Sequence, residues 1–232
     1  MSNSALAIIP ARGGSKRIPR KNIRQFEGKP IIAYSIESAI RSNCFDTVMV
    51  STDDHEIAGI AQEHGAKVPF MRTPRSSDDY AGLDDVAVEV VNQFESQGKT
   101  FEYVCILLPT APLLQAERIN EGYRLLLEKN ANVVVPVVRY SYPIQRALKI
   151  DANDLVSMVS PDFYEFRSQD LMPTYHDSGQ FYWLKRSAVR PKMDFFGHNC
   201  VAMILPEREV QDIDTIEDWH LAELKLRSIS LA

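Results

Sequence analysis

Short apolar runs alternate with segments of helical periodicity along most of this chain, and this alternation constrains the fold more than any other feature. Each run has the length of a strand and is bounded by turn-forming residues, whereas the segments between runs repeat apolar residues every three or four positions. We expect strands at 6–9, 47–51, 103–108, 133–138, 180–184 and 201–205, and helices at 31–40, 54–64, 83–97, 117–129 and from about 216. This order predicts an α/β fold, doubly wound, with a mainly parallel, Rossmann-like sheet and helices on both faces.

The pattern is interrupted between about residues 139 and 177, where aromatic residues accumulate and helical periodicity is weak. The 232 residues suit a single domain, 1–232, because a chain of this length buries enough surface to fold without disulfides. We therefore interpret 139–177 as a small hairpin-type insert within that domain. It is expected to cover a binding site or to pair with a second subunit, as a dimerisation element.

Charge and hydropathy argue against two classes of partner. The net charge is −5, whereas a protein that binds nucleic acid in general is more often basic. No apolar run approaches the ~18 residues of a membrane span, and the first run, 5–10, is too short for a signal peptide. The three cysteines form no CxxC pair, which is typical of a reducing compartment. We expect a soluble, cytoplasmic protein.

A basic, glycine-bearing loop follows the first predicted strand. Six cations fall between residues 12 and 24, so removing them from a net −5 leaves −11 for the rest of the chain: Arg12, Lys16, Arg17, Arg20, Lys21 and Arg24. Glycines let backbone N–H groups approach phosphate oxygens, and Arg and Lys add charge-assisted hydrogen bonds. The loop is neither a GxxxxGK[ST] loop nor a GxGxxG fingerprint. It predicts a polyphosphate site; a solvated basic turn is the alternative.

Two aspartates near the end of the chain form the second candidate site. Asp212 and Asp214 are two positions apart, so in an extended segment their side chains share one side, about 6–7 Å apart along the chain. That arrangement suits Mg²⁺, which takes one or two carboxylates and completes its shell with water and substrate phosphate. The alternative is that Asp214 or Thr215 caps the last helix, with Glu217 or Asp218 completing a capping box.

The segment IPARGGSKRIPRKN resembles the signature of the CMP-N-acylneuraminate cytidylyltransferase family, and the resemblance extends over nearly the whole chain. It implies a nucleotidyltransferase whose first loop wraps the triphosphate of CTP, with Arg12 and Lys21 nearest the reacting phosphates. It also implies that QDIDT is the family's Asp-x-Asp metal motif, held by Asp212 and Asp214. The resemblance implies these CTP-binding residues: Ala11, Arg12, Gly13, Gly14, Ser15, Lys16, Lys21, Asn22, Arg72 and Asp79. Without the resemblance, Arg72 would be interpreted as a surface charge.

The sugar site is expected at Leu107–Leu113 and in the insert. The first segment resembles the family's PTSP segment beside the sugar, which suggests Thr110; sialic acid enzymes usually have Gln before that Pro, where this chain has Leu108. An acidic sugar needs a cation for its carboxylate, and arginine binds carboxylates in bidentate fashion. SYPIQRAL and YHDSGQFYW resemble the pseudaminic acid members of the family. The candidates are Gln145, Arg146, Arg167 (the first choice for the carboxylate), Gln169, His176 and Gln180. A structural role is the alternative for His176.

These features predict an enzyme that transfers CMP from CTP to the anomeric hydroxyl of an acidic nine-carbon sugar, pseudaminic acid preferred, and releases pyrophosphate. The same reaction on N-acetylneuraminic, legionaminic or 3-deoxy-octulosonic acid is the nearest alternative. A CTP-sensing domain without catalysis is an alternative of another class. The resemblance and the aromatic insert suggest a homodimer.

Overall fold

A computed structural model describes residues 4–15, 17–73, 76 and 81–230, so Lys16 and Asp79 lie outside the described residues. Within these residues the main sheet has seven strands, six of them in the order β11-β6-β10-β5-β1-β4, with β9 pairing β6. The strands are β1 (Ala5–Pro10), β4 (Thr47–Ser51), β5 (Tyr103–Leu107), β6 (Val133–Arg139), β9 (Tyr175–Asp177), β10 (Phe181–Lys185) and β11 (Cys200–Ile204). The helices are α1 (Ile31–Ser42), α2 (His55–Glu63), α4 (Leu83–Ser96), α5 (Ala116–Glu128) and α6 (Ile216–Ser230). Every predicted strand and helix above is present, within a few residues.

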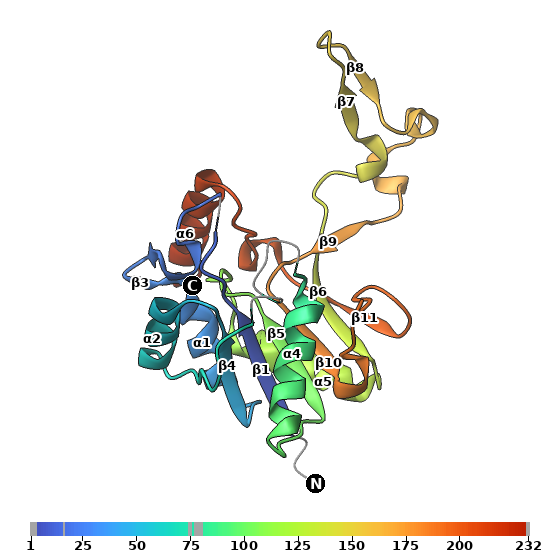
Figure 1. Cartoon of the computed structure of the whole chain (residues 1–232). Helices are drawn as coiled ribbons and strands as arrows, with labels where there is room; N and C mark the ends of the chain where they lie inside the picture. The colour runs from blue at the N-terminus through green and yellow to red at the C-terminus, as the bar shows by residue number, and fades with distance from the viewer. Residues whose placement is uncertain (1–3, 16, 74–75, 77–80, 231–232) are drawn as a thin grey trace.

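The sheet is mainly parallel, as predicted. Strand β1 pairs in parallel with β4 and β5, and β11 pairs in parallel with β6 (Figure 1). Strand β10 runs antiparallel between β5 and β6. The chain leaves the sheet along β6 and returns from the arm along β9 and then β10, which both pair antiparallel with β6. In residues 140–180, which the structure describes throughout, no crossover helix precedes β10, so it runs opposite to β5 and β6.

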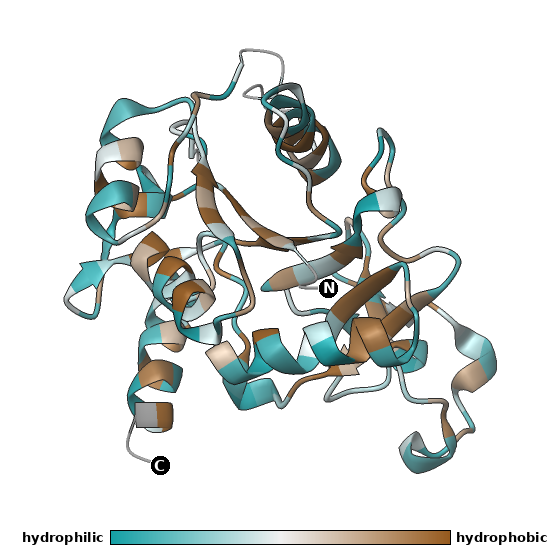
Figure 2. Ribbon diagram, turned by 90° about the horizontal axis from the view of Figure 1, so that it is seen from below, coloured by the Kyte–Doolittle hydropathy of each residue, from teal (hydrophilic) through white to brown (hydrophobic). Residues whose placement is uncertain are grey.

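Helices cover both faces of the sheet, which confirms the doubly wound architecture. Along β1, residues 5, 7 and 9 pack with α1, α2 and α5, whereas residues 6 and 8 pack with α4 on the other face. All five side chains are fully buried. Figure 2 shows the hydrophobic residues gathered on the strands and on the sides of the helices that face them. Within the described residues, no helix combines the length and apolar character needed to cross a membrane.

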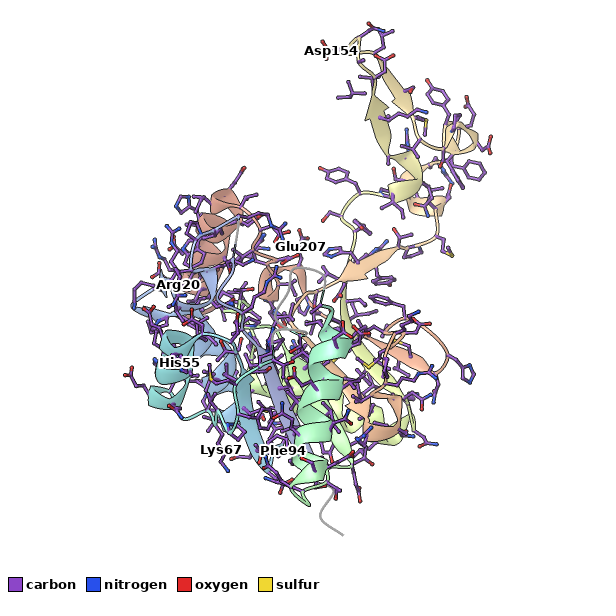
Figure 3. The ribbon with its side chains drawn as sticks, in the orientation of Figure 1. Arg20, His55, Lys67, Phe94, Asp154 and Glu207 are labelled. Atoms are coloured by element: carbon purple, nitrogen blue, oxygen red, sulfur yellow. The ribbon has the colours of Figure 1, made fainter. Side chains whose placement is uncertain are left out.

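The segment 139–177 projects from this body as an arm (Figure 1). Strands β6 and β9 pair antiparallel at its base, and a hairpin of β7 (Leu148–Ile150) and β8 (Val156–Met158) lies at its end. Figure 3 places Asp154 at the far tip and Glu207 near the base. The hairpin is present where the sequence analysis expected one; its role in dimerisation remains a prediction.

Candidate active site

A cleft of about 590 Å³ opens where β1 and β5 end. In parallel sheets, ligands bind outside the carboxyl ends of the strands, so the cleft lies where a substrate site is expected. Leu108 and Leu83 supply apolar lining beside the polar groups. Six residues predicted from the sequence line the cleft: Arg12, Ser15, Lys21, Asn22, Arg72 and Thr110.

The glycine loop is closed on itself and held against the start of α2. The buried Asn22 donates through Nδ2 to the carbonyl of Arg12 (2.9 Å). The N–H of Gly13 donates to Oδ1 of Asp53 (3.0 Å). A Cβ added at Gly13 would lie 2.7 Å from Oδ2 of Asp54, so only glycine allows this approach. The loop is therefore shaped by side chains from β4's carboxyl end as well as by its own residues.

Arg20 supplies the second attachment of the loop to α2. It has a left-handed backbone (φ 56°), which is unfavourable for a residue with a side chain. Its guanidinium is bound by the carboxylates of Asp54 and Glu56. Asp54 also caps α2 by accepting from the N–H groups of Glu56 (2.9 Å) and Ile57 (3.1 Å). The hydrogen bond from Arg20 is the largest cause that lowers the pKa of Asp54 to about 2.

The loop and the two C-terminal aspartates meet at Lys21. Its Nζ donates to the carbonyl oxygen of Ile213 (2.5 Å) and lies 3.8 Å from Oδ1 of Asp214. Arg17 Nη1 lies 2.6 Å from Oδ2 of the same Asp214. Burial lowers the pKa of Lys21, and the charges of Asp214 and Asp212 oppose that shift. Segments almost 200 residues apart in sequence therefore meet at Lys21, which lines the cleft.

The donor set at this point fits a divalent cation. Burial is the largest cause of a raised pKa at Asp212, and the negative charge of Asp214 is the second. A bound cation would reduce the electrostatic repulsion between these two carboxylates. Carboxylate oxygens are also the ligands that Mg²⁺ prefers. Within the described residues, no group of three His, Cys, Asp or Glu side chains could hold a metal ion, so the remaining ligands would be water and substrate phosphate.

The start of α6 is capped by side chains other than those of Asp212 and Asp214. The N–H of Asp218 donates to Thr215 Oγ1 (3.2 Å), and the N–H of Thr215 donates to the Asp218 carboxylate (2.8 Å). The N–H of Asp214 also donates to that carboxylate (3.1 Å). Thr215 and Asp218 therefore form the capping box, and the Asp214 carboxylate faces the basic loop.

Arg72 belongs to the cleft rather than to the outer surface. Its Nη2 donates to the carbonyl of Ser51 (2.7 Å) and its Nε to the hydroxyl of the same residue (3.2 Å). Burial lowers its pKa, and the charge of Asp53 opposes that shift. The guanidinium is thus fixed at the end of β4, where it lines the cleft.

The residues predicted to bind the sugar do not converge on this cleft within one chain, except Thr110. Arg167 is exposed and pairs with Asp170 (2.7 Å), and the side chain of Gln145 donates to the carbonyl of Met172 (2.9 Å). Arg146 donates weakly to a carbonyl of the insert (3.5 Å). The remaining insert candidates, Gln169 and His176, also lie on the arm or its base. The insert carries these side chains away from the cleft, so their roles remain predictions.

The carboxylate of Asp177 does not pair with His176. His176 Nδ1 lies 2.8 Å from the backbone oxygen of Asp177, whereas the Asp177 side chain accepts from the hydroxyl of Tyr182 and the N–H of Gly179 (3.0 Å). This arrangement agrees with a structural role for His176.

Gln180 lies inside the protein rather than in the cleft. It is 2% exposed, and its side-chain Nε2 donates to the backbone carbonyl of Glu209 (2.6 Å). The backbone carbonyl of Gln180 accepts from the N–H of Leu108 (2.8 Å). Glu209 is itself buried and receives two hydrogen bonds from Arg118, of 2.8 and 3.0 Å. These contacts fix the segment that leads to Asp212. The sequence analysis missed the Arg118–Glu209 pair because no spacing signal links residues 91 positions apart.

Comparison with known proteins identifies the family of the chain. A family model described as cytidylyltransferase matches residues 6–203. The chain is 42% identical over 219 residues to a pseudaminic acid cytidylyltransferase of Campylobacter jejuni, covering 94% of each protein. It is 32% identical to a CMP-N,N'-diacetyllegionaminic acid synthase of Legionella pneumophila, again covering 94% of each.

Among solved structures, a CMP:2-keto-3-deoxy-manno-octonic acid synthetase complexed with CTP matches with a TM-score of 0.72 at 18% identity, covering 99% of this chain and 100% of that one. At that identity the match establishes the fold alone, and it agrees with the α/β sheet described above. The family match and the relatives extend over most of the chain. The chain belongs to the cytidylyltransferase family and is a nucleotidyltransferase.

Proposed function

We propose that this enzyme transfers CMP from CTP to the anomeric hydroxyl of a nonulosonic acid, with pseudaminic acid as the preferred substrate, and releases pyrophosphate. The observation that supports it most is the junction at Lys21, where the cationic glycine loop meets Asp214 at one end of a cleft. A site that is cationic on one side and anionic on the other suits a triphosphate together with a divalent ion. The 42% identity to a pseudaminic acid cytidylyltransferase favours that sugar.

The proposed reaction is an in-line displacement at the α-phosphorus of CTP. The anomeric oxygen of the sugar bonds to the α-phosphorus, the bond from that phosphorus to the bridging oxygen of pyrophosphate breaks, and the hydroxyl proton leaves to a base or to solvent. Such catalysis depends mainly on positioning and on electrostatic stabilisation. Arg12 and Lys21 are proposed to neutralise charge on the leaving group, while Gly13, Gly14 and Ser15 hold the phosphates.

Asp212 and Asp214 are the proposed ligands of Mg²⁺, which when bound would neutralise phosphate charge. Lys21 keeps Asp214 in position through its bond to the neighbouring carbonyl of Ile213. Turnover should therefore fall by about 100-fold or more in Asp212→Asn or Asp214→Asn. Glu217→Gln is the matched control, because it removes one negative charge from the same segment and lies in the first turn of α6. Near-normal turnover of Asp212→Asn over a range of magnesium concentrations would contradict the assignment.

We also propose that the enzyme is a cytoplasmic homodimer in which the arm of one subunit reaches the cleft of the other. The arm exposes large apolar side chains, which soluble proteins rarely leave uncovered in such number. They include Tyr142 (85% exposed), Ile150 (69%) and Tyr164 (68%). A partner's arm would also bring Arg146 and Arg167 to a cleft that they do not reach within one chain. Sedimentation velocity tests this: a dimer is expected, and a monomer at working concentrations would refute it.

A panel of sugars tests the substrate. Pyrophosphate release from CTP is measured with pseudaminic, N-acetylneuraminic, legionaminic and 3-deoxy-octulosonic acids, and kcat/KM is compared. We expect the highest value for pseudaminic acid; no release with it would refute the preference. A CTP-sensing domain would bind CTP and release no pyrophosphate with any sugar.

A further inference from the structure

The proposed reaction gives no role to the contact between Arg17 and Asp214. Arg17 Nη1 lies 2.6 Å from Oδ2 of Asp214, and the two side chains are 67% and 39% exposed. Arg17 also lines the cleft. A guanidinium therefore lies against a carboxylate that we assign to a divalent ion.

Among the residues that the structure describes, two cations contact Asp214, and they differ in how freely their side chains can move. Lys21 is 17% exposed, and its Nζ is fixed by the carbonyl of Ile213. Arg17 is a long, mostly exposed side chain on the loop, with several rotatable bonds through which its guanidinium can move. Of the two, Arg17 is the cation that can leave Asp214 without disturbing buried contacts.

We propose that Arg17 is an exchangeable counter-ion: it pairs with Asp214 when no divalent cation is bound, and it moves to a phosphate of the nucleotide when the cation takes Asp214. The proposal rests on the assignment of Asp214 as a metal ligand. It follows from competition, because a divalent ion on Asp214 would neutralise the carboxylate charge that attracts the guanidinium at 2.6 Å, and the two cations would repel each other. It also follows from proximity, since the displaced guanidinium lies beside the cleft and arginine binds phosphate oxygens in bidentate fashion.

Competition predicts opposite effects on two ligands. Exposed ion pairs are weak, so removing Arg17 should strengthen cation binding to the nucleotide-free protein by only about 1.5- to 5-fold. A hydrogen bond from a charged group to phosphate is stronger, so the same change should weaken nucleotide binding in the presence of the cation by roughly tenfold or more. A residue with a purely structural role would not move the two affinities in opposite directions.

The experiment measures Mn²⁺ binding to the full chain by electron paramagnetic resonance, without nucleotide, for the wild type, Arg17→Gln, Arg24→Gln and Asp214→Asn. Arg24→Gln is the matched control, because it removes the same charge from the same loop at a residue that lies over the ring of Trp219 (5.1 Å). CTP affinity is then measured by calorimetry at saturating Mn²⁺. We expect tighter Mn²⁺ binding and weaker CTP binding for Arg17→Gln alone.

The outcomes separate the two assignments. If Asp214→Asn removes Mn²⁺ binding while Arg17→Gln binds Mn²⁺ no better than Arg24→Gln, the metal site stands and the counter-ion role is refuted. Tighter Mn²⁺ binding with unchanged CTP affinity would refute the transfer to phosphate. If Asp214→Asn leaves Mn²⁺ binding unchanged, both the metal assignment and the role of Arg17 are refuted.

Discussion

Replacing Arg118 with methionine should destabilise the protein far more than the same change at Arg186. The two arginines each make a pair of hydrogen bonds of 2.8 and 3.0 Å, Arg118 to Glu209 and Arg186 to Glu95. They differ in burial: the Glu209 side chain is 6% exposed and the Glu95 side chain 36%. The geometry of the two pairs is the same, so burial is the main difference between them. Arg118 also pairs with Glu121 (2.7 Å), whose side chain is 44% exposed, and an exposed contact of this kind adds about 0–1 kcal/mol.

The expected magnitudes follow from that difference. Removing one partner of a buried pair leaves an uncompensated charge and costs about 3–5 kcal/mol, whereas an exposed pair is worth about 0–1 kcal/mol. Because Arg118 itself is 28% exposed, we take the lower end, about 3 kcal/mol, for Arg118→Met. For a chain of this size that corresponds to a fall in Tm of roughly 6–12 °C, against about 2 °C for Arg186→Met.

Urea denaturation and thermal melting of both variants measure these values, with Arg118→Met/Glu209→Met as the third variant. The double variant should recover much of the loss, since it leaves no buried charge unpaired; Glu121, which also pairs with Arg118, is 44% exposed. The single variant should also raise the magnesium concentration needed for half-maximal activity, because Glu209 precedes the segment with Asp212. Equal losses for Arg118→Met and Arg186→Met would refute the argument from burial.

Three further predictions concern the glycine loop and its attachment to α2. Gly13→Ala should weaken CTP binding at least fivefold in calorimetry, since the new Cβ would lie 2.7 Å from Asp54 and overpacking costs about 1 kcal/mol or more. Gly59→Ala in α2, where nothing lies within 4 Å of the added Cβ, should bind CTP normally, and equal affinities for the two variants would contradict this account of the loop. The pKa of Asp54, about 2, is below its unfolded value, so the stability it contributes is present above about pH 4 and lost as pH falls toward 2. Asp54→Asn retains the helix cap, and it should reduce by about 1 kcal/mol the loss of unfolding free energy between about pH 4 and pH 2, measured by urea denaturation at a series of pH values. An unchanged pH dependence would refute the Arg20–Asp54 assignment. Lys21→Met should lower kcat by about 100-fold or more with the fold intact by circular dichroism, and a kcat within a few-fold of the wild type would exclude the proposed role.

Much of the fold could be predicted because it depends on local patterns. Strand β4 is a run of apolar residues bounded by polar ones, and its predicted ends at 47 and 51 are those observed. The direction of β10 could not be predicted, because periodicity shows that a segment is a strand and not which way it runs. Strands β2 (Gln25–Phe26) and β3 (Lys29–Pro30) have two residues each, which is too short for an alternation of apolar and polar residues to be recognised.

The residues of the candidate site could be predicted from the sequence better than the contacts between them. The six cations between 12 and 24 mark the loop, yet Arg20 pairs with Asp54 and Glu56, and Arg24 lies over Trp219. A count of charges cannot separate cations that face the cleft from cations used to hold the loop, since that depends on contacts made after folding. For the same reason the sequence could not show that the arm carries Arg167 away from the cleft.

A crystal structure of the enzyme with Mg²⁺ and a non-hydrolysable analogue of CTP tests the central claim most directly. We expect the triphosphate in the cleft between the glycine loop and the end of β5, contacted by Arg12 and Lys21, with the ion bridging a phosphate oxygen to Asp212 and Asp214. A nucleotide bound elsewhere, or a triphosphate in the cleft whose ion lies away from both aspartates, would contradict the account.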